Sequence, residues 1–281
     1  MQTGQGVATA APTPTPTPTN APGAMTPPRV EVTGIKKRFG SIEALRGVDL
    51  AVWPGEVVGL VGDNAAGKST LTKIISGAYV PDAGRIAVDG APVTFANPAD
   101  ARAARIEMVY QDLSLCDTID VAGNLFLGRE PTKRLLGWRL LDKRRMVEEA
   151  KRHLDDLDIH IPNLKALVAQ LSGGQRQTIA IGRAAAFAPK LLIMDEPTSA
   201  LAVAEVDAVL RLIKRLAADG VSIILITHRL QDLFRVCDRI AVMYEGLKVA
   251  ERRIDETDLE DLVGLIVGEK ARQLKGTANG G

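Results

Sequence analysis

The sequence predicts an α/β protein with a mainly parallel sheet at its core, an antiparallel β subdomain and an inserted α-helical subdomain. Two segments, Val30 to Ile35 and Val48 to Val52, alternate apolar and polar residues and predict strands with one buried face. Three almost wholly apolar runs predict strands buried on both faces, which are typical of parallel sheets: Val57 to Val61, Leu191 to Met194 and Val221 to Thr227.

The composition is that of an ordinary globular protein. The 281 residues are 46% hydrophobic and 25% charged, with a net charge of +1, which suits one large core or two small ones and gives no indication of a nucleic-acid partner. Cys116 and Cys237 lie far apart and predict reduced thiols in a cytosolic protein. No apolar run approaches the roughly 18 residues of a membrane span, so any membrane function requires a separate spanning chain.

Residues 1–28 have the composition of a disordered tail. They carry no charged side chain, and proline alternates with threonine from Thr13 to Thr19, so the segment cannot bury enough apolar surface to offset its ordering entropy. It lacks the basic start and apolar segment of a secretory signal, and Met25 is an alternative initiator. We expect a folded part from residue 29 to about 268 and a second disordered tail over residues 269–281.

The remaining segments predict two hairpins, one short strand and a terminal helix. The short strand, Ile106 to Tyr110, is expected between the two hairpins in the sequence. The spacing of Thr257-Asp258-Leu259-Glu260 is that of a capping box and predicts a last helix through about Val267. The hairpins are expected to pair Arg85 to Val88 with Val93 to Phe95 across Asp89-Gly90, and Ile240 to Tyr244 with Leu247 to Ala250.

The segment at about residues 113–187 is expected to form the helical subdomain. Asp120 and Asp142 are placed to cap two helices, and the second helix is expected to run through Leu157. A third helix is expected from Gln175 to Phe187. This subdomain would therefore be inserted between two strands of the core, Ile106 to Tyr110 and Leu191 to Met194.

The first apolar strand runs directly into a stretch with the spacing of a phosphate-binding loop. Apolar residues at helical spacing follow it and stop at Gly77. A strand, a Gly-rich turn and a helix together aim backbone N–H groups at an anion. Lys68 is therefore expected to reach the terminal phosphates of a nucleotide, and Ser69 to hold Mg²⁺. The stretch reads Gly62-Asp63-Asn64-Ala65-Ala66-Gly67-Lys68-Ser69-Thr70.

Polar side chains follow the other two apolar runs. Asp195 and Glu196 come directly after Leu191 to Met194, and an unpaired buried carboxylate there is unfavourable. Beside a phosphate loop, we expect Asp195 to hold Mg²⁺ and Glu196 to act as general base on the attacking water, with pairing to Lys or Arg as the alternative. His228 ends Val221 to Thr227, at the edge where open α/β sheets bind ligands.

Two further features have a functional and a structural interpretation. Phe39, next to Gly40, is equally compatible with stacking on a base and with packing. The stretch Ser172-Gly173-Gly174-Gln175, before a helix, fits a second anion-binding turn or a simple helix cap.

These motifs, in this order, resemble those of the ATP-binding subunit of an ABC transporter. The resemblance covers residues 29 to about 268 and implies a P-loop NTPase core. It favours the functional interpretation of Phe39 and of the Ser172 stretch. In the terms of that family, the Walker A loop is Gly62 to Thr70, the Q-loop glutamine is Gln111, the signature sequence is Leu171 to Gln175, Walker B and its glutamate are Leu191 to Glu196, the switch histidine is His228, and the adenine-stacking aromatic is Phe39.

The resemblance implies that two cassettes pack head to tail, with each ATP between the Walker A loop of one copy and the signature sequence of the other. Ser172, Gly173 and Gly174 would contact the γ-phosphate of the ATP bound to the other copy. Gln111 would join the Mg²⁺ ligands, sense the γ-phosphate and pass the motion to a membrane permease. Since the chain has one copy of each motif, it implies a homodimer at the cytoplasmic face of the cell membrane. Hydrolysis would rest on Lys68, Gln111, Glu196 and His228.

The same resemblance indicates a substrate class. The stretches Gly62 to Asn64, Asn124 to Glu130 and Glu196 to Leu201 look most like cassettes of the fructose- and ribose-type importers. We therefore expect an ATPase that energises monosaccharide uptake together with a permease and an extracytoplasmic sugar-binding protein. The alternatives are a cassette for another substrate, a soluble ABC ATPase of DNA repair or translation, and an ATP-binding switch without turnover. The presence of Glu196 and His228 argues against that switch.

Two positions depart from the pattern of the family. Ala202 stands where the family usually has aspartate, which puts the coupling of the two ATP sites in doubt. Ala65 stands where many members have a third glycine in the phosphate loop. If the backbone needs a positive φ there, Ala65 is expected to be strained.

Overall fold

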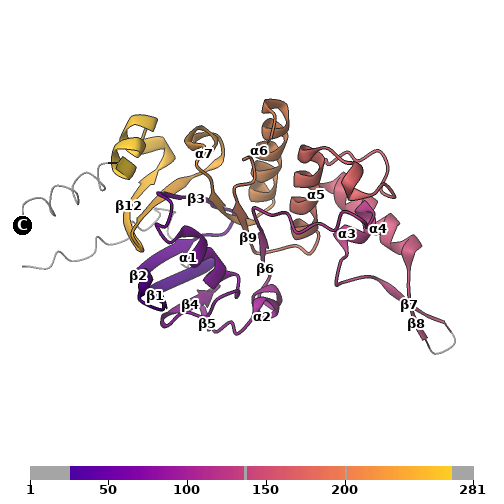
Figure 1. The fold of residues 1–281 in the computed structure, drawn as a ribbon, viewed down its shortest axis with the longest axis horizontal. Helices are drawn as coiled ribbons and strands as arrows, with labels where there is room; N and C mark the ends of the chain where they lie inside the picture. The colour runs from indigo at the N-terminus through magenta and orange to yellow at the C-terminus, as the bar shows by residue number, and fades with distance from the viewer. Residues whose placement is uncertain (1–25, 136–137, 200, 268–281) are drawn as a thin grey trace, which may run out of the picture.

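The structure is a computed structural model that describes residues 26–135, 138–199 and 201–267 (Figure 1). The predicted tails at residues 1–28 and 269–281 lie outside the described residues, except for residues 26–28. The two predicted subdomains lie on different sides of a central sheet (Figure 1).

The central sheet is mainly parallel, as predicted. Its strand order is β12-β11-β3-β10-β9-β6, and within the described part of this sheet only the β11–β12 pair is antiparallel. The strands are β3 (Val57–Gly62), β6 (Ile106–Val109), β9 (Leu191–Asp195), β10 (Ser222–Ile226), β11 (Arg239–Tyr244) and β12 (Leu247–Arg253).

The central strands are buried on both faces because the chain covers each face with a different layer. In β10, Ile223 and Leu225 pack into the core on one face, whereas Ile224 and Ile226 pack into the core on the other. This division explains why the three apolar runs lack polar alternation. The helices beside the sheet are α1 (Lys68–Ile75), α2 (Pro98–Ala103), α6 (Val203–Ala218) and α7 (Leu230–Val236).

A separate antiparallel sheet has the order β2-β1-β4-β5. Its first two strands are longer than predicted, because a tight turn at Gly40-Ser41 lets pairing continue to Phe39, the last residue of β1. The predicted hairpin at Asp89-Gly90 is confirmed, although β5 begins right after this turn and not at Val93. Its strands are β1 (Val30–Phe39), β2 (Ile42–Val52), β4 (Ala83–Val88) and β5 (Ala91–Val93).

Three helices lie between β6 and β9 in the sequence and form one end of the molecule (Figure 1). The predicted caps are confirmed: Asp120 accepts a hydrogen bond from the N–H of Gly123 at 2.7 Å, and Asp142 from that of Arg145 at 3.2 Å. The sequence did not predict the two-stranded ribbon β7 (Thr132–Leu135) and β8 (Trp138–Leu141) within this region. The helices are α3 (Val121–Leu125), α4 (Lys143–Asp156) and α5 (Gly173–Ala185).

The last helix, residues 259–267, begins with a different cap from the predicted one. The side chain of Asp258 accepts a hydrogen bond from the N–H of Asp261 at 2.8 Å. Thr257 donates its hydroxyl to the Asp261 carboxylate, also at 2.8 Å. The predicted capping box from Thr257 to Glu260 is therefore wrong by one residue, because a carboxylate one position later takes the N-cap role.

This correction can be tested by stability measurements. Asp258→Ala is expected to lower the free energy of unfolding by about 1 kcal/mol, since it removes the N-cap acceptor. Glu260→Ala, the matched control, is expected to change it by less than about 0.5 kcal/mol. Urea denaturation measures both values, and a larger loss for Glu260→Ala would favour the capping box from Thr257.

Candidate nucleotide-binding site

The parallel strands bring the predicted polar residues to one edge of the central sheet. β10 lies between β3 and β9, and its Ile226 is level with Leu60 on one side and with Asp195 on the other. The phosphate loop leaves β3 at this edge, His228 follows β10, and Gln111 follows β6, the neighbour of β9. The fold therefore gathers four separate motifs where their strands end.

The phosphate loop depends on two glycines at close approaches of the backbone. Gly62 has φ 144° and Gly67 has φ 98°, both in the region that favours glycine. A Cβ atom on Gly62 would lie 2.1 Å from the carbonyl oxygen of Met243, and one on Gly67 would lie 2.7 Å from that of Ala44. Larger residues at either position would push the loop away from β11 or β2.

Ala65 carries the strain that the sequence predicted. Its φ is 68°, in the left-handed region, where an L-residue other than glycine costs roughly 1–2 kcal/mol. The neighbouring Ala66 is not among the residues with positive φ, and its side chain is buried. The loop thus holds one strained alanine next to an unstrained one.

Lys68 folds back over the loop that precedes it. Its Nζ donates hydrogen bonds to the carbonyl oxygens of Gly62 at 2.8 Å and Asp63 at 2.9 Å. Burial lowers the pKa of Lys68, and this effect is only partly opposed by the carboxylates of Glu196 and Asp195. The ammonium group is therefore held at the mouth of the loop, where phosphate oxygens would compete with the two carbonyls.

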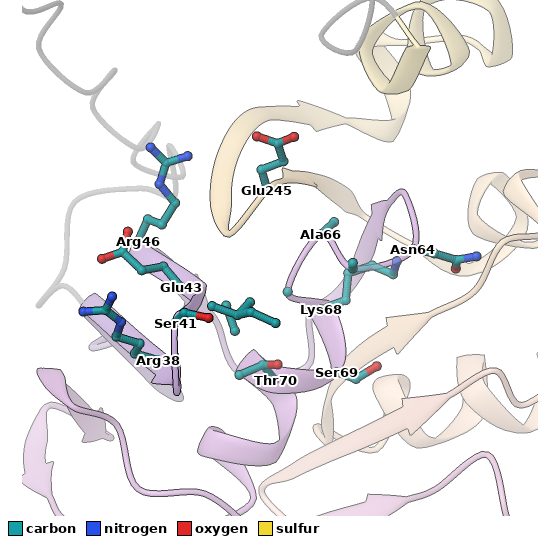
Figure 2. A pocket seen from close by; sticks show the side chains of 14 residues that line it. Arg38, Ser41, Glu43, Arg46, Asn64, Ala66, Lys68, Ser69, Thr70 and Glu245 are labelled. Atoms are coloured by element: carbon teal, nitrogen blue, oxygen red, sulfur yellow. The ribbon is translucent and has the colours of Figure 1, made fainter. Parts of the chain in front are cut away.

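A cavity of about 820 Å³ lies between the phosphate loop and the end of the antiparallel sheet. Figure 2 shows side chains of this sheet on one side of the cavity, Lys68 and Ser69 on the other, and Glu245 of the β11–β12 turn above. Its volume lies within the range of small-molecule sites. It is lined by residues 64–70 and by Arg38, Ser41, Ile42, Glu43, Ala44, Arg46 and Glu245.

Phe39 is not one of the residues that line this cavity, although the adjacent Arg38 is. The Phe39 ring meets Tyr79 edge-on, with centroids 5.2 Å apart, and the Nζ of Lys37 lies 5.5 Å from its centroid. The side chain is nonetheless 42% exposed. The geometry thus leaves a free ring surface beside the cavity but does not place the ring in its wall.

The two acids after β9 differ in their surroundings. Burial, together with the neighbouring Glu196 charge, raises the pKa of Asp195, and Lys68 only partly opposes this shift. Glu196 has φ 53°, and its backbone N–H donates to the carbonyl of Ile226 at 2.9 Å. This left-handed conformation turns the chain sharply at the strand end, as strained residues at functional sites often do.

Glu196 and His228 approach each other across the strand ends. Oε2 of Glu196 lies 2.8 Å from Nδ1 of His228, an ion-pair distance, but the contact lacks the geometry of a hydrogen bond. Within the described residues this buried Oε2 has no hydrogen-bond partner. A buried carboxylate oxygen without a donor requires an explanation, and an incoming water would provide the donor.

A buried hydrogen bond joins the segments that follow Glu196 and His228. The Thr198 hydroxyl donates to the carboxylate of Asp232, at the start of α7, at a distance of 2.8 Å, and both side chains are buried. Arg229 joins them, with its guanidinium 3.3 Å from the Thr198 carbonyl and 3.4 Å from the Asp232 carboxylate. The segments after Glu196 and after His228 are thereby tied together, which the sequence gave no means to foresee.

The predicted signature segment forms the start of α5. The helix begins at Gly173, two residues before the predicted start, and Ser172 is its N-cap. The Ser172 hydroxyl accepts from the N–H of Gln175 at 3.2 Å, and the Gln175 side chain accepts from the N–H of Ser172 at 3.0 Å. Sequence reasoning missed a third partner, Glu205 of α6, whose carboxylate lies against the same segment.

The residues predicted to hold Mg²⁺ offer suitable atoms. Ser69, Gln111 and Asp195 supply a hydroxyl, an amide and a carboxylate oxygen, the hard donors that this ion prefers. No group of three His, Cys, Asp or Glu side chains within the described residues could bind a metal. A Mg²⁺ ion here would therefore depend on phosphate oxygens, as is usual for this ion.

The fold and the loop at the end of β3 define a phosphate-loop nucleotide-binding protein. Residues 45–199 match the family described as "ABC transporter". The chain is 43% identical to a xylose/arabinose import ATP-binding protein of Sulfolobus acidocaldarius, over 83% of this chain and 91% of that protein. It is 42% identical to a fructose import ATP-binding protein of Rhizobium meliloti, over 86% and 95% of the two chains.

Solved structures agree with these matches. An ATP-binding cassette of an ABC transporter in its ADP conformation superposes with a TM-score of 0.74 at 28% identity, covering 89% of this chain and 99% of that one. A nucleotide-free cassette gives a TM-score of 0.72 at 30% identity, covering 80% and 91%. The chain belongs to the ABC transporter family, as an ATP-binding cassette. Within the described residues, no helix has the length and apolar character needed to span a membrane.

The strain at Ala65 gives a testable expectation. Ala65→Gly is expected to raise the free energy of unfolding by about 0.5–1 kcal/mol, because relief of the left-handed conformation outweighs the added freedom of the unfolded chain. Ala66→Gly, the matched control, is expected to lower it by a similar amount. Urea denaturation measures both, and a loss of stability with Ala65→Gly would contradict the assignment of strain.

Proposed function

We propose that this chain is the ATP-hydrolysing subunit of an importer that takes up a monosaccharide through a separate membrane permease. The observation that carries the proposal is the identity of about 40% with import ATP-binding proteins for xylose/arabinose and fructose over most of both chains. The chain also has Lys68, two acids (Asp195 and Glu196) and His228 at one edge of the central sheet.

The proposal includes the domain organisation of the chain. We assign the helical subdomain to about residues 113–187.

In the proposed reaction, water attacks the γ-phosphorus of ATP, and ADP leaves with its β-phosphate oxygen. Glu196 accepts a proton from this water through its buried Oε2, which has no hydrogen-bond partner among the residues that the structure describes. His228 lies 2.8 Å from that oxygen and is 71% exposed, so it would orient the carboxylate and contact the γ-phosphate. The strained backbone at Glu196 aims the carboxylate out of the strand.

The phosphates would be held by the loop after β3. The Lys68 ammonium would leave the carbonyls of Gly62 and Asp63 for phosphate oxygens, which carry full negative charge and bind it more strongly. When bound, Mg²⁺ would supply positive charge that neutralises the phosphates. Ser69, Asp195 and Gln111 would hold it, and Phe39 would stack on the adenine.

The working unit would be a homodimer. The chain has one phosphate loop and one signature segment, so a complete site requires the signature segment of a second copy. The dimer would close only while the γ-phosphate links the two copies, which makes it a switch driven by hydrolysis. We place it at the cytoplasmic face of the membrane, bound to permease subunits that receive substrate from an extracytoplasmic sugar-binding protein.

Removal of the general base tests the chemical assignment. Glu196→Gln is expected to lower the ATP hydrolysis rate by about 10²–10⁴-fold and to leave a stable dimer with ATP bound. Phosphate release measures the rate, and sedimentation measures the dimer. Glu148→Gln, on the exposed face of α4, is the control and is expected to retain the rate. Turnover of Glu196→Gln at the unsubstituted rate would refute the assignment.

Removal of the loop lysine tests the binding assignment. Lys68→Ala is expected to weaken ATP binding by about 100-fold, since it removes charge-assisted hydrogen bonds to the phosphates. Lys73→Ala, on the same helix but beside Tyr79, is the control and is expected to retain the affinity. Titration with a fluorescent ATP analogue measures both, and an unchanged affinity for Lys68→Ala would contradict the proposed loop.

A transport measurement tests the substrate class. Cells that lack this chain are expected to lose ATP-dependent uptake of at least one labelled monosaccharide among xylose, arabinose, fructose and ribose. Re-expression of the unsubstituted chain, but not of Glu196→Gln, is expected to restore it. Normal uptake of all four sugars in its absence would contradict monosaccharide import while leaving the ATPase assignment in place.

A further inference from the structure

We infer that Glu205 is a positioning residue that occupies the anion donors of the signature segment while a cassette is open and yields them to the γ-phosphate when two cassettes close. This inference rests on the proposed function, because it takes the signature segment as the group that binds the ATP held by a second copy. It adds a competitor within the chain for the same donors.

The carboxylate of Glu205 bridges two helix starts. Its Oε1 accepts hydrogen bonds from the Ser172 hydroxyl at 3.1 Å and from the N–H of Gly174 at 3.2 Å. Its Oε2 accepts from the N–H of Ala202, the N-cap of α6, at 3.2 Å. These hydrogen bonds lower the pKa of Glu205, so the group is an anion at neutral pH.

Two of the three donors proposed to hold the γ-phosphate are thus already bonded to an anionic oxygen. A carboxylate and a phosphate both need charge-assisted hydrogen bonds from such donors, and two anions in one place repel each other. The γ-phosphate therefore cannot bind Ser172 and Gly174 in the proposed manner unless Glu205 withdraws.

The carboxylate also fills the space at Gly174. A Cβ atom built on Gly174 would lie 2.5 Å from both Cδ and Oε1 of Glu205. Because Gly174 has no side chain, the carboxylate can lie directly against its backbone. That position is where a phosphate oxygen would have to approach the same N–H.

The fold offers Glu205 another position. A cavity of about 380 Å³ lies between α5 and α6, and its lining includes Glu205, Ser172 and the two α6 arginines Arg211 and Arg215. Rotation of the side chain into this cavity would release Ser172 and Gly174, together with the bond that Oε2 accepts from the N–H of Ala202. The positive charges of Arg211 and Arg215 in the lining would favour the carboxylate there.

The exchange of Glu205 for the γ-phosphate at these donors predicts the sign of the change in dimer stability when Glu205 is replaced. Loss of the Glu205 carboxylate is expected to free the donors and strengthen the ATP-dependent dimer. A purely structural role, in which Glu205 only holds the signature segment in shape, predicts the opposite sign. The dimer is measured by sedimentation equilibrium with ATP, using full-length chains that all carry Glu196→Gln to prevent turnover.

With Glu205→Ala, the dissociation constant of this dimer is expected to fall about tenfold, the size of one lost charge-assisted competitor. Glu205→Gln is expected to give a smaller fall, because a neutral acceptor binds the donors less strongly while glutamine retains the cap of α6. It also keeps the test valid if Glu205→Ala unfolds. Asp219→Asn, at the opposite end of α6, removes the same charge and is expected to change nothing.

Ser172→Ala distinguishes the proposed role of the signature segment from the proposed role of Glu205. It is expected to weaken the dimer if the signature segment binds the γ-phosphate. If Ser172→Ala weakens the dimer but both Glu205 variants leave it unchanged or weaker, Glu205 does not compete, and the proposed function stands without it. If Ser172→Ala has no effect, the proposed role of the signature segment fails, and the inference fails with it.

Discussion

The parallel pairing of β3, β10 and β9 is the constraint on which the site depends. It sets Ile226 level with Leu60 and Asp195, so the loops after all three strands begin at the same height. A shift of one residue in this register would turn every strand side chain to the opposite core. The phosphate loop and the Glu196–His228 contact are therefore consequences of how two apolar cores fill both faces of one sheet.

The groups proposed to bind phosphate are held by oxygens of the chain itself. Lys68 donates to two carbonyls of its own loop, and Ser172 and Gly174 donate to the Glu205 carboxylate. Such internal partners keep strong donors satisfied at small net free energy, because one hydrogen bond replaces another. The phosphates of ATP would then replace these internal acceptors: two neutral carbonyls that bind Lys68 at the phosphate loop, and the Glu205 carboxylate at the signature segment.

Much of this arrangement was predictable from the sequence, and the limits have physical causes. Periodicity marked the core strands, since burial on both faces leaves an apolar run, and spacing marked the phosphate loop. The β7–β8 ribbon was missed because its strands have only four residues each and their apolar side chains do not alternate with polar ones: Trp138, Leu140 and Leu141 are all exposed. The bonds of Glu205 to Ser172 and the tie between Thr198 and Asp232 were missed because they join residues more than thirty positions apart, which no local pattern encodes. The strain at Ala65 was foreseen, because many members of the family that the chain resembles have a glycine at this position of the loop.

We propose that a complete site takes its phosphate loop from one copy of the chain and its signature segment from another. The decisive measurement is the ATP hydrolysis rate of Lys68→Ala chains mixed with Ser172→Arg chains, because each variant alone lacks one part of every site. In a head-to-tail dimer, half of the mixed population has one intact site of two, so we expect about a quarter of the rate of the unsubstituted chain. A mixture no more active than the two variants measured separately would refute a site shared between two copies.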